Sequence, residues 1–366
     1  MKGIGHLAAQ AARAPSIAAT VALTIAGVGM AAIPASALSS PSVAQAANSS
    51  VIAAAGPGNS LFLYSQPVGG QGWRAQEVAD GNTTYSDPSV AQVANSVVIA
   101  AEGPGNSLDF YEQPIGAKGW HAEQVTGKNT TYSDPSVTRV GNSTVIAVEG
   151  PGNSLDLYVQ PIGAQGWGAE GVAAEDTTYS APSVARVGDA TVIAAEGRDH
   201  TLQSYYQPGD GRGWQPEPVA GENTTYSSPS AAQVGQSSVI AAEGPNDSLD
   251  FYYQPIGQEG WHPQTVAGKN TTYSSPSIAQ VGRSSVIAVE GSAHKLNMYY
   301  QPIGTPGWHP EEVDLDNTTF SAPSVAQVAS STVIAVHGQV GCLYFYYQPI
   351  GKPRWSPREQ VNCVSP

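Results

Sequence analysis

Short apolar stretches alternate with turn residues along almost the whole chain. In one segment, small apolar residues at 88–93 are followed by a β-branched, Ala-rich stretch at 97–102. A Gly-Pro-Gly-Asn turn then precedes an alternating stretch at 107–113, and a Gly-Trp pair at 119–120 opens a fourth stretch. Stretches of this length, bounded by Gly and Pro, are typical of β-strands. No segment has a helical period, so the pattern predicts an all-β chain with four short strands per unit.

This unit recurs with a fixed period of 47 residues. The period is marked by all seven tryptophans, Trp73, Trp120, Trp167, Trp214, Trp261, Trp308 and Trp355. Four strands in 40–50 residues are typical of a β-propeller blade, so seven units predict one seven-bladed β-propeller. The small first strand is expected near the crowded axis, and the Trp-led fourth strand at the outer edge. The repeats are expected to start near Ser40, Asp87, Asp134, Ala181, Ser228, Ser275 and Ala322.

The first 37 residues have the pattern of a secretory signal. A start containing Lys2 and Arg13 precedes an apolar, uncharged run at 17–33, and Ala35-Ser36-Ala37 fits a cleavage site. The apolar run is short for a membrane span, which favours export over anchoring. Cleavage after Ala37 leaves 329 residues, seven times 47. We therefore expect a signal peptide at 1–37, a propeller at 38–366 and a secreted protein.

The net charge disfavours certain classes of partner, and the two cysteines predict a disulfide. The formal net charge is −14, and loss of Lys2 and Arg13 moves it to −16. An acidic surface disfavours nucleic acid and anionic membranes as partners. The two cysteines, Cys342 and Cys363, are expected to start the third strand and end the fourth strand of the last unit. Antiparallel pairing brings these positions side by side, which predicts a disulfide that pins the C-terminal strand.

Two further features concern that last unit. With this cleavage site, no strand is shared between the two ends of the chain to lock the ring. The unit also has one extra residue between Trp355 and Val361, which is consistent with a bulge.

Candidate ligand-binding residues come from three repeated positions: the acid that ends the second strand, the polar face of the third strand, and the tryptophan. A carboxylate beside aromatic and amide groups offers the mixed donors and acceptors that sugar hydroxyls need. The candidates are Glu102, Asp109, Tyr111 and Trp120 in the second unit, Glu149, Asp156, Tyr158 and Trp167 in the third, and Glu243, Asp250, Tyr252 and Trp261 in the fifth.

Each position also has a structural interpretation. A large aromatic in every blade often seals the contact between blades, and we favour that role for most of the tryptophan area. The Tyr and Gln of the third strand recur in all units and suit a hydrogen-bond ladder, whereas the Asp varies. The second-strand acid suits sugar hydroxyls, calcium or a turn cap, and Ala55 and His337 replace it in the end units. Calcium is disfavoured because no Asp-x-Asp-x-Asp run occurs.

Signs of catalysis are weak. The chain has no Gly-x-Ser-x-Gly, His-Glu-x-x-His or P-loop motif, and His121, His262 and His309 are not at metal-binding spacing. The five Asn-Thr-Thr sequences match a glycosylation signal, but we interpret them as turns that open the linkers. We predict no catalytic residue, cofactor or metal. A cleft lined by a lone acid pair, absent from other blades, would instead favour an enzyme.

The repeat resembles bacterial seven-bladed propeller lectins of the fucose-binding type and, more distantly, five-bladed tachylectin-like propellers. The resemblance spans residues 38–366 and rests on four stretches: Ser-x-Pro-Ser-Val-Ala, Val-Ile-Ala-x-Glu-Gly, Ser-Leu-x-x-Tyr-x-Gln and Gly-Trp. It implies shallow sugar sites between neighbouring blades, formed by aromatic and polar side chains. The chain departs from these lectins in having Tyr-rich third strands where they tend to carry more Trp.

The expected function is a secreted, multivalent lectin without catalysis, with six or seven weak sites that gain affinity through avidity. Fucosylated, galactosylated and methylated glycans are the partners to test, and the protein is expected to be a monomer or small homo-oligomer with no membrane insertion. The alternatives are a non-catalytic scaffold for a protein or cell-envelope partner and, less favoured, a secreted glycan lyase or hydrolase.

Overall fold

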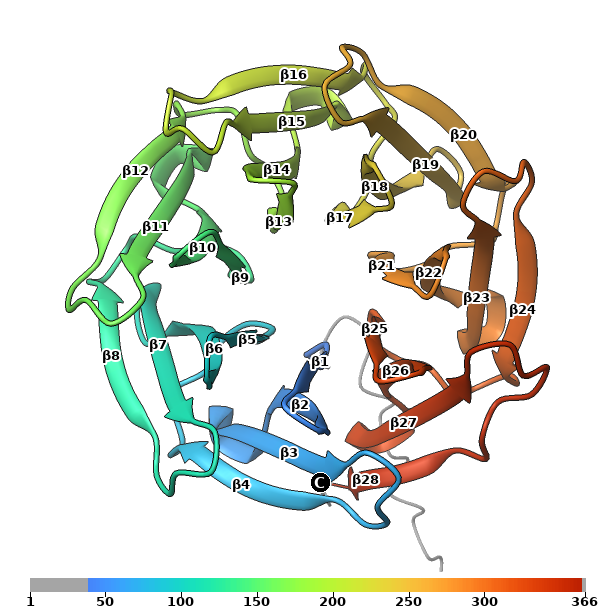
Figure 1. Ribbon diagram of the computed structural model, residues 1–366, viewed down its shortest axis with the longest axis horizontal. Helices are drawn as coiled ribbons and strands as arrows, with labels where there is room; N and C mark the ends of the chain where they lie inside the picture. Colours follow the sequence, from blue (N-terminus) through green and yellow to red (C-terminus); the bar gives the residue numbers. More distant parts are fainter. Residues whose placement is uncertain (1–38, 364–366) are drawn as a thin grey trace, which may run out of the picture. The chain divides into compact units, whose positions relative to one another are not determined.

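Seven four-stranded sheets surround a common axis in the computed structural model, which describes residues 39–363 (Figure 1). Every sheet is antiparallel, and its four strands follow one another in the sequence. Each sheet is therefore one 47-residue repeat, and the predicted seven-bladed all-β propeller is confirmed. The predicted signal peptide lies outside the described residues. Within 39–363, none of the helical segments is long and apolar enough to cross a membrane.

The strands have similar bounds in every blade. Blades 1 and 2 consist of β1 (Ser42–Ala46), β2 (Ser49–Ala55), β3 (Leu61–Pro67), β4 (Arg74–Ala79), and β5 (Ser89–Val93), β6 (Ser96–Gly103), β7 (Ser107–Pro114), β8 (His121–Thr126). Blades 3 and 4 consist of β9 (Ser136–Val140), β10 (Ser143–Glu149), β11 (Leu155–Pro161), β12 (Gly168–Ala173), and β13 (Ser183–Val187), β14 (Ala190–Glu196), β15 (Leu202–Gln207), β16 (Gln215–Ala220). Blade 5 consists of β17 (Ser230–Val234), β18 (Ser237–Gly244), β19 (Ser248–Pro255) and β20 (His262–Ala267). Blades 6 and 7 consist of β21 (Ser277–Val281), β22 (Ser284–Gly291), β23 (Lys295–Pro302), β24 (His309–Asp314), and β25 (Ser324–Val328), β26 (Ser331–His337), β27 (Cys342–Pro349), β28 (Glu359–Cys363).

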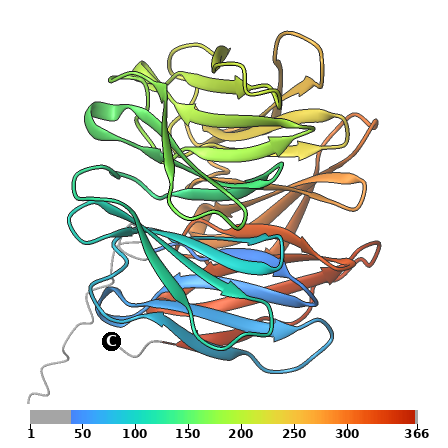
Figure 2. The same cartoon turned by 60° about the vertical axis from the view of Figure 1, so that its left-hand side comes forward.

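The first strand of each blade lies next to the axis and the fourth lies at the outer edge, as the sequence predicts (Figure 1). Because the strands cross the disk antiparallel to one another, their connections divide between two faces (Figure 2). We call the first the linker face; it carries the loops between second and third strands and the linkers between blades, such as 127–135. The opposite face, which we call the hairpin face, carries the turns between first and second strands and the loops between third and fourth strands.

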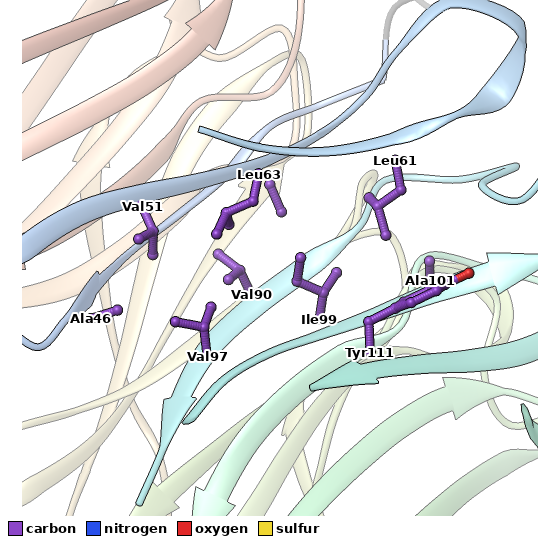
Figure 3. Close-up of a cluster of buried hydrophobic side chains, with 10 residues drawn as sticks. Ala46, Val51, Leu61, Leu63, Val90, Val97, Ile99, Ala101 and Tyr111 are labelled. Carbon is purple, nitrogen blue, oxygen red and sulfur yellow. The ribbon is translucent and has the colours of Figure 1, made fainter. Parts of the chain in front are cut away.

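The core lies between blades. Figure 3 shows one such contact, where Leu61 and Leu63 of blade 1 pack against Val90, Ile99 and other residues of blade 2. Ile99 and Leu61 are fully buried. Alternation along a strand explains the arrangement, since one side of each blade faces the preceding blade and the other side faces the next.

The tryptophans complete these contacts. Trp167 of blade 3 meets the Phe110 ring of blade 2 edge-on, with ring centroids 5.0 Å apart. Trp308 meets Phe251 of blade 5 in the same way at 5.0 Å. All seven tryptophans are half-buried and pack against a core cluster between blades. The predicted role of the tryptophans as seals between blades is confirmed.

The linkers owe their path to the repeated Asn-Thr-Thr sequence. Asn129 has a φ of 60°, in the left-handed region that Asn tolerates better than most residues. Its backbone N–H donates to the Gly105 carbonyl at 2.9 Å, and the Thr130 N–H donates to the Asn106 carbonyl at 2.9 Å. The linker is thus fastened to the loop between the second and third strands of its own blade. The interpretation of these residues as linker turns is confirmed.

One hydrogen bond recurs at every junction near the axis. The Ser42 hydroxyl of blade 1 accepts from the Val90 N–H of blade 2 at 3.1 Å, and equivalent bonds join each blade to the next. At the seam between the chain ends, the Ser324 hydroxyl of blade 7 accepts from the Val43 N–H of blade 1 at 3.0 Å. The ring therefore closes without a strand shared between its ends, as expected.

The seam has additional fastenings. Cys342 and Cys363 are directly paired in β27 and β28 and form the predicted disulfide. Blade 7 does have a bulge beside Val361, but the extra residue does not create it. The register shift beside Val361 occurs at the same place in the other six blades, such as at Val125 in blade 2. The extra residue lengthens the loop instead, because β28 begins four residues after Trp355, whereas β8 begins immediately after Trp120.

Candidate functional site

The three kinds of sequence-predicted site residue do not meet in one place. Glu102 ends β6 on the linker face, whereas Trp120 precedes β8 on the hairpin face. Asp109 lies near the linker face as well, about four strand positions or ~13 Å from the Trp120 end. Glu102 is paired with Leu108, so Glu102 and Asp109 project from opposite sides of blade 2. The same separation holds for Glu149, Asp156 and Trp167 in blade 3, and for Glu243, Asp250 and Trp261 in blade 5.

Asp109 and its counterparts are half-buried against the backbone of their own blade. A Cβ placed on Gly103 would lie 2.0 Å from Asp109 Oδ2, so only glycine fits beside that carboxylate. Asp156 and Asp250 crowd Gly150 and Gly244 in the same way. Burial raises the pKa of all three carboxyls above its ordinary value.

The tyrosines of the third strand belong to the core. Tyr111, Tyr158 and Tyr252 are 5%, 8% and 6% exposed, which leaves little of each ring for a ligand. Burial, and secondarily the nearby Asp109 or Asp250, raises the pKa of Tyr111 and Tyr252 to about 12. Six of the seven neighbouring glutamines form the expected ladder between blades, whereas Gln113 donates to the Gly119 carbonyl of its own blade. For example, Gln160 Nε2 donates to Glu123 of blade 2 at 3.2 Å. Gln254 makes the same bond to Glu217 at 3.2 Å.

In two blades the indole N–H of the tryptophan donates a hydrogen bond to a glutamate of this ladder or of its equivalent position. Trp73 Nε1 donates to Glu359 at 3.3 Å, and Trp214 Nε1 donates to Glu170 at 3.4 Å, in each case across a blade junction. Since the indole ring is itself half-buried against the core, only its outer edge is available on the hairpin face.

A repeated polar and aromatic unit emerges instead on the linker face. The exposed member is the tyrosine that follows Asn-Thr-Thr, or Asp176-Thr-Thr before blade 4, with 38–47% of its surface accessible in Tyr85, Tyr132, Tyr179, Tyr226 and Tyr273. Its backbone N–H donates to the carbonyl of the second-strand acid; Tyr132 bonds Glu149 in this way at 2.9 Å. The same bond joins Tyr85 to Glu102 at 2.9 Å. We call this tyrosine and this acid the Tyr–Glu unit.

A third side chain in the loop between second and third strands orients the acid. Asn106 Nδ2 donates to Glu102 Oε1 at 3.0 Å, and Asn153 makes the same bond to Glu149 at 2.9 Å. A histidine takes this place in blade 4, where His200 Nδ1 lies 2.6 Å from Glu196 Oε1. That ring also stacks on Tyr226, with ring centroids 4.6 Å apart.

The carboxyl groups of the Tyr–Glu units have raised pKa values. Burial raises the pKa of Glu149 and Glu243 to about 7, and nearby Asp247 and Glu196 contribute at Glu243. The pKa of Glu102, Glu196 and Glu290 is also raised by burial. Near neutral pH such a carboxyl can accept or donate hydrogen bonds, which suits a neutral polyol better than an anion.

In blade 4 the Tyr–Glu unit borders a pocket of about 360 Å³. Its lining includes Tyr179, Glu196, His200, Glu222 and Asn223. One half-exposed aromatic ring, carboxyl groups and an amide therefore converge on a volume within the range of small-ligand sites.

A larger cavity of about 570 Å³ lies where the linkers approach the axis. Asp87 and Asp134 line it from successive linkers, and the Asp87 N–H donates to Asp134 Oδ1 at 2.8 Å. Burial and the charge of Asp134 raise the pKa of Asp87 to about 7. The equivalent position is Ser or Ala in the other five repeats. This is the kind of lone acid pair that was named above as a sign of an enzyme.

Sequence analysis missed both the exposed tyrosines and this acid pair. The signal for the tyrosines was present, since a large aromatic recurs at a fixed place in polar linkers. In the sequence, the acid pair is marked only by Asp87 and Asp134 standing where the other five repeats have Ser or Ala. Within 39–363, no group of three or more His, Cys, Asp or Glu could hold a metal ion.

Comparison with known proteins identifies the fold. No family model and no curated protein matches the chain. Among solved structures, the BP39L lectin from Burkholderia pseudomallei superposes with a TM-score of 0.80 and 13% identity, over 89% of this chain and 99% of that one. A mutant of the Aleuria aurantia lectin in complex with α-methyl-L-fucoside gives a TM-score of 0.54 and 12% identity, over 74% and 92%. A prolyl endopeptidase structure gives 0.54 and 11% identity, over 87% of this chain but 49% of that one.

Proposed function

We propose that this chain is a secreted carbohydrate-binding protein whose sites are the Tyr–Glu units of the linker face. The observation that carries the proposal is the recurrence of one exposed tyrosine, one partly or fully buried acid and the backbone bond between them in blades 2–6. Blade 7 has Phe320 and His337 at these positions, and blade 1 has Ala55 in place of the acid. The complete unit thus occurs five times.

The chemistry of the unit suits a sugar. A tyrosine ring that is 38–47% exposed can cover the apolar C–H face of a pyranose, while the acid and its Asn or His neighbour bind hydroxyl groups. Each site is shallow and is expected to be weak alone. Five sites on one face bind a multivalent glycan with greater apparent affinity through high effective concentration.

Two further observations support the proposal. The structures to which the fold is similar include the Burkholderia pseudomallei lectin and the fucoside complex of the Aleuria aurantia lectin. The disulfide between Cys342 and Cys363 suits an oxidising compartment, in agreement with export directed by residues 1–37.

Glycan-array binding of the full chain tests the proposal, with fucosylated, galactosylated and methylated sugars among the probes. A variant with alanine at Tyr132, Tyr179 and Tyr226 should lose most of its array signal, because three of five sites lose their aromatic surface. Tyr347→Ala provides a matched control, since Tyr347 is 37% exposed but lies in blade 7, which lacks the unit.

Full binding by the triple variant, with wild-type thermal stability, would contradict these sites. Pull-down from the cell envelope separates a sugar ligand from a protein partner. Competition by free monosaccharide supports the lectin, and capture that monosaccharide does not affect favours the scaffold alternative.

A second candidate function, glycan hydrolysis, is favoured by one observation, the acid pair Asp87 and Asp134 in the 570 Å³ cavity. Paired carboxylates with different pKa values are the usual groups of glycoside hydrolysis. Release of reducing sugar from the glycans that bind on the array, abolished by Asp134→Asn, would establish it. Intact glycans after prolonged incubation would leave binding as the function.

A further inference from the structure

The hairpin face carries a surplus of positive charge, although the chain as a whole is acidic. Among residues 39–363, the exposed charged side chains at this end of the strands are eight Lys or Arg, such as Lys118, Arg283 and Lys352, and three acids. The acids are Asp189, Asp210 and Glu259. The formal net charge of the chain is −14, so its negative charge must be concentrated elsewhere.

The linker face has the opposite balance. In the part of the chain that the structure describes, its exposed acids number six and include Asp80 and Glu175, against the three exposed cations Lys128, Arg198 and Lys269. The half-buried or buried carboxyl groups of the Tyr–Glu units add to this negative charge when they are ionised. The ring is therefore polar along its axis, with a basic face on one side and an acidic face on the other (Figure 2).

An apolar arc lies among the cations of the hairpin face. It consists of the residue that follows the third strand in the consecutive blades 5, 6, 7 and 1, with 37–44% of its surface exposed in Ile256, Ile303, Ile350 and Val68. Ile303 lies beside the first turn of the preceding blade, since its Cδ1 is 3.3 Å from where a Cβ on Gly235 would be. Ile350 lies beside Gly282 in the same way. Two of the four side chains thus lie along a blade junction, which suits a broad partner surface.

The linker face has apolar groups that match this arc. Its five tyrosines are 38–47% exposed and Leu315 is 65% exposed, all among acidic residues. Apolar and aromatic contacts together with complementary charges are typical of protein interfaces, in which Tyr and Arg are enriched. Both faces belong to the same ring of seven blades, so a second copy placed on the first has the same blade spacing.

We propose that the hairpin face of one molecule binds the linker face of a second copy, so that rings stack head to tail. Because two different surfaces meet, the interface is heterologous, and the free face at each end of a stack can bind a further copy. Association is therefore open-ended. The proposal rests on charge and exposed apolar groups and does not depend on glycan binding.

Sedimentation velocity of the purified chain over a range of concentrations tests the stack. At 0.15 M ionic strength the Debye length is about 8 Å, so charges in contact count for more than the repulsion between the net charges of two copies. We expect the mean sedimentation coefficient to rise with concentration beyond the value of a dimer. A variant with Lys118→Glu and Lys352→Glu should associate about tenfold or more weakly, because two attractive contacts become repulsive. Neither lysine takes part in a salt bridge within residues 39–363.

A variant with Lys128→Glu and Lys269→Glu is the matched control. It has the same change in net charge, but it makes the linker face more acidic, so its association should equal or exceed that of the unchanged chain. All four lysines are exposed, and wild-type thermal unfolding of both variants checks that they fold.

A charge-swap experiment tests which faces meet. A variant with Asp80→Lys and Glu175→Lys alters the linker face outside the Tyr–Glu units and should also associate weakly by itself. Mixing it with the Lys118, Lys352 variant should restore association, because the altered faces of the two variants have opposite charge. Failure of the mixture to associate would overturn the pairing of these faces.

Three other outcomes would also overturn the proposal. The first is a monomer at all concentrations, and the second is an equal loss of association in the Lys128, Lys269 control. The third is a dimer that does not grow, which would indicate a closed pair in place of a stack. A monomer that co-sediments with phosphatidylserine vesicles, unless Lys118 and Lys352 are replaced, would reassign the hairpin face to an anionic membrane.

Discussion

Removal of the bond between Cys342 and Cys363 should loosen β28, the outermost strand of the last blade, without opening the rest of the ring. The two cysteines are 21 residues apart, and the entropy of closing a loop of that size corresponds to about 3 kcal/mol. Cys363 is the last residue of β28, so the bridge acts where the strand would otherwise fray. Without it, local opening of β28 should become on the order of 100-fold more frequent.

Native-state hydrogen exchange measures this directly. Amides of residues 359–363 should exchange on the order of 100-fold faster in a Cys342→Ser, Cys363→Ser variant than in the oxidised chain. Amides of β24, the equivalent strand of blade 6, serve as the internal control and should keep their rates. Other contacts also hold β28: Glu359 accepts from Gln66, and Asn362 donates to the Tyr64 hydroxyl at 2.8 Å. Unchanged exchange in β28 would show that these bonds suffice and would refute the role assigned to the disulfide.

Two further predictions concern buried acids. Because the pKa of Glu149 is about 7 in the folded chain against an ordinary 4.5, the folded state keeps a proton that the unfolded state has lost; stability should therefore fall as pH rises from about 4.5 to about 7. Glu149→Gln should reduce this fall in thermal unfolding at pH 5 and pH 8, and an equal fall in the variant would contradict the assignment. Gly103→Ala should lower the urea-unfolding free energy by about 1–3 kcal/mol because its Cβ would overlap Asp109, and a second change, Asp109→Ala, should recover part of the loss. Gly127→Ala is the control, since nothing lies within 4 Å of the added carbon, and a similar loss there would show that crowding against Asp109 is not the cause.

Most of what can be predicted about this fold follows from the repeat period of the sequence. A spacing of 47 residues determines the number of blades, and the small residues around Val90 and the large Trp120 indicate which strand lies inside and which outside. The disulfide follows from the same reasoning, because antiparallel pairing relates the start of one strand to the end of the next.

Convergence of side chains is harder to predict, since it depends on which side of a strand faces which neighbour. Asp109 and Glu102 lie close in sequence but project from opposite sides of the blade. Conversely, Asp87 and Asp134 are 47 residues apart and come together only because the ring brings successive linkers to the axis. The exposure of Tyr132 depends on the linker path, which is set by backbone hydrogen bonds that no side-chain pattern reveals.

The hydrogen bond between Ser42 and Val90 recurs at all seven junctions, including the seam between Ser324 and Val43. Near the axis, the junction between the chain ends is therefore held by the same bond as every other junction. Cutting the chain in another linker and joining the present ends should give a circular permutant with the same ring. Gain or loss of a whole 47-residue unit would likewise change the number of blades and keep the same serine bond at each junction. Duplication of one unit is therefore a simple route by which such a ring grows.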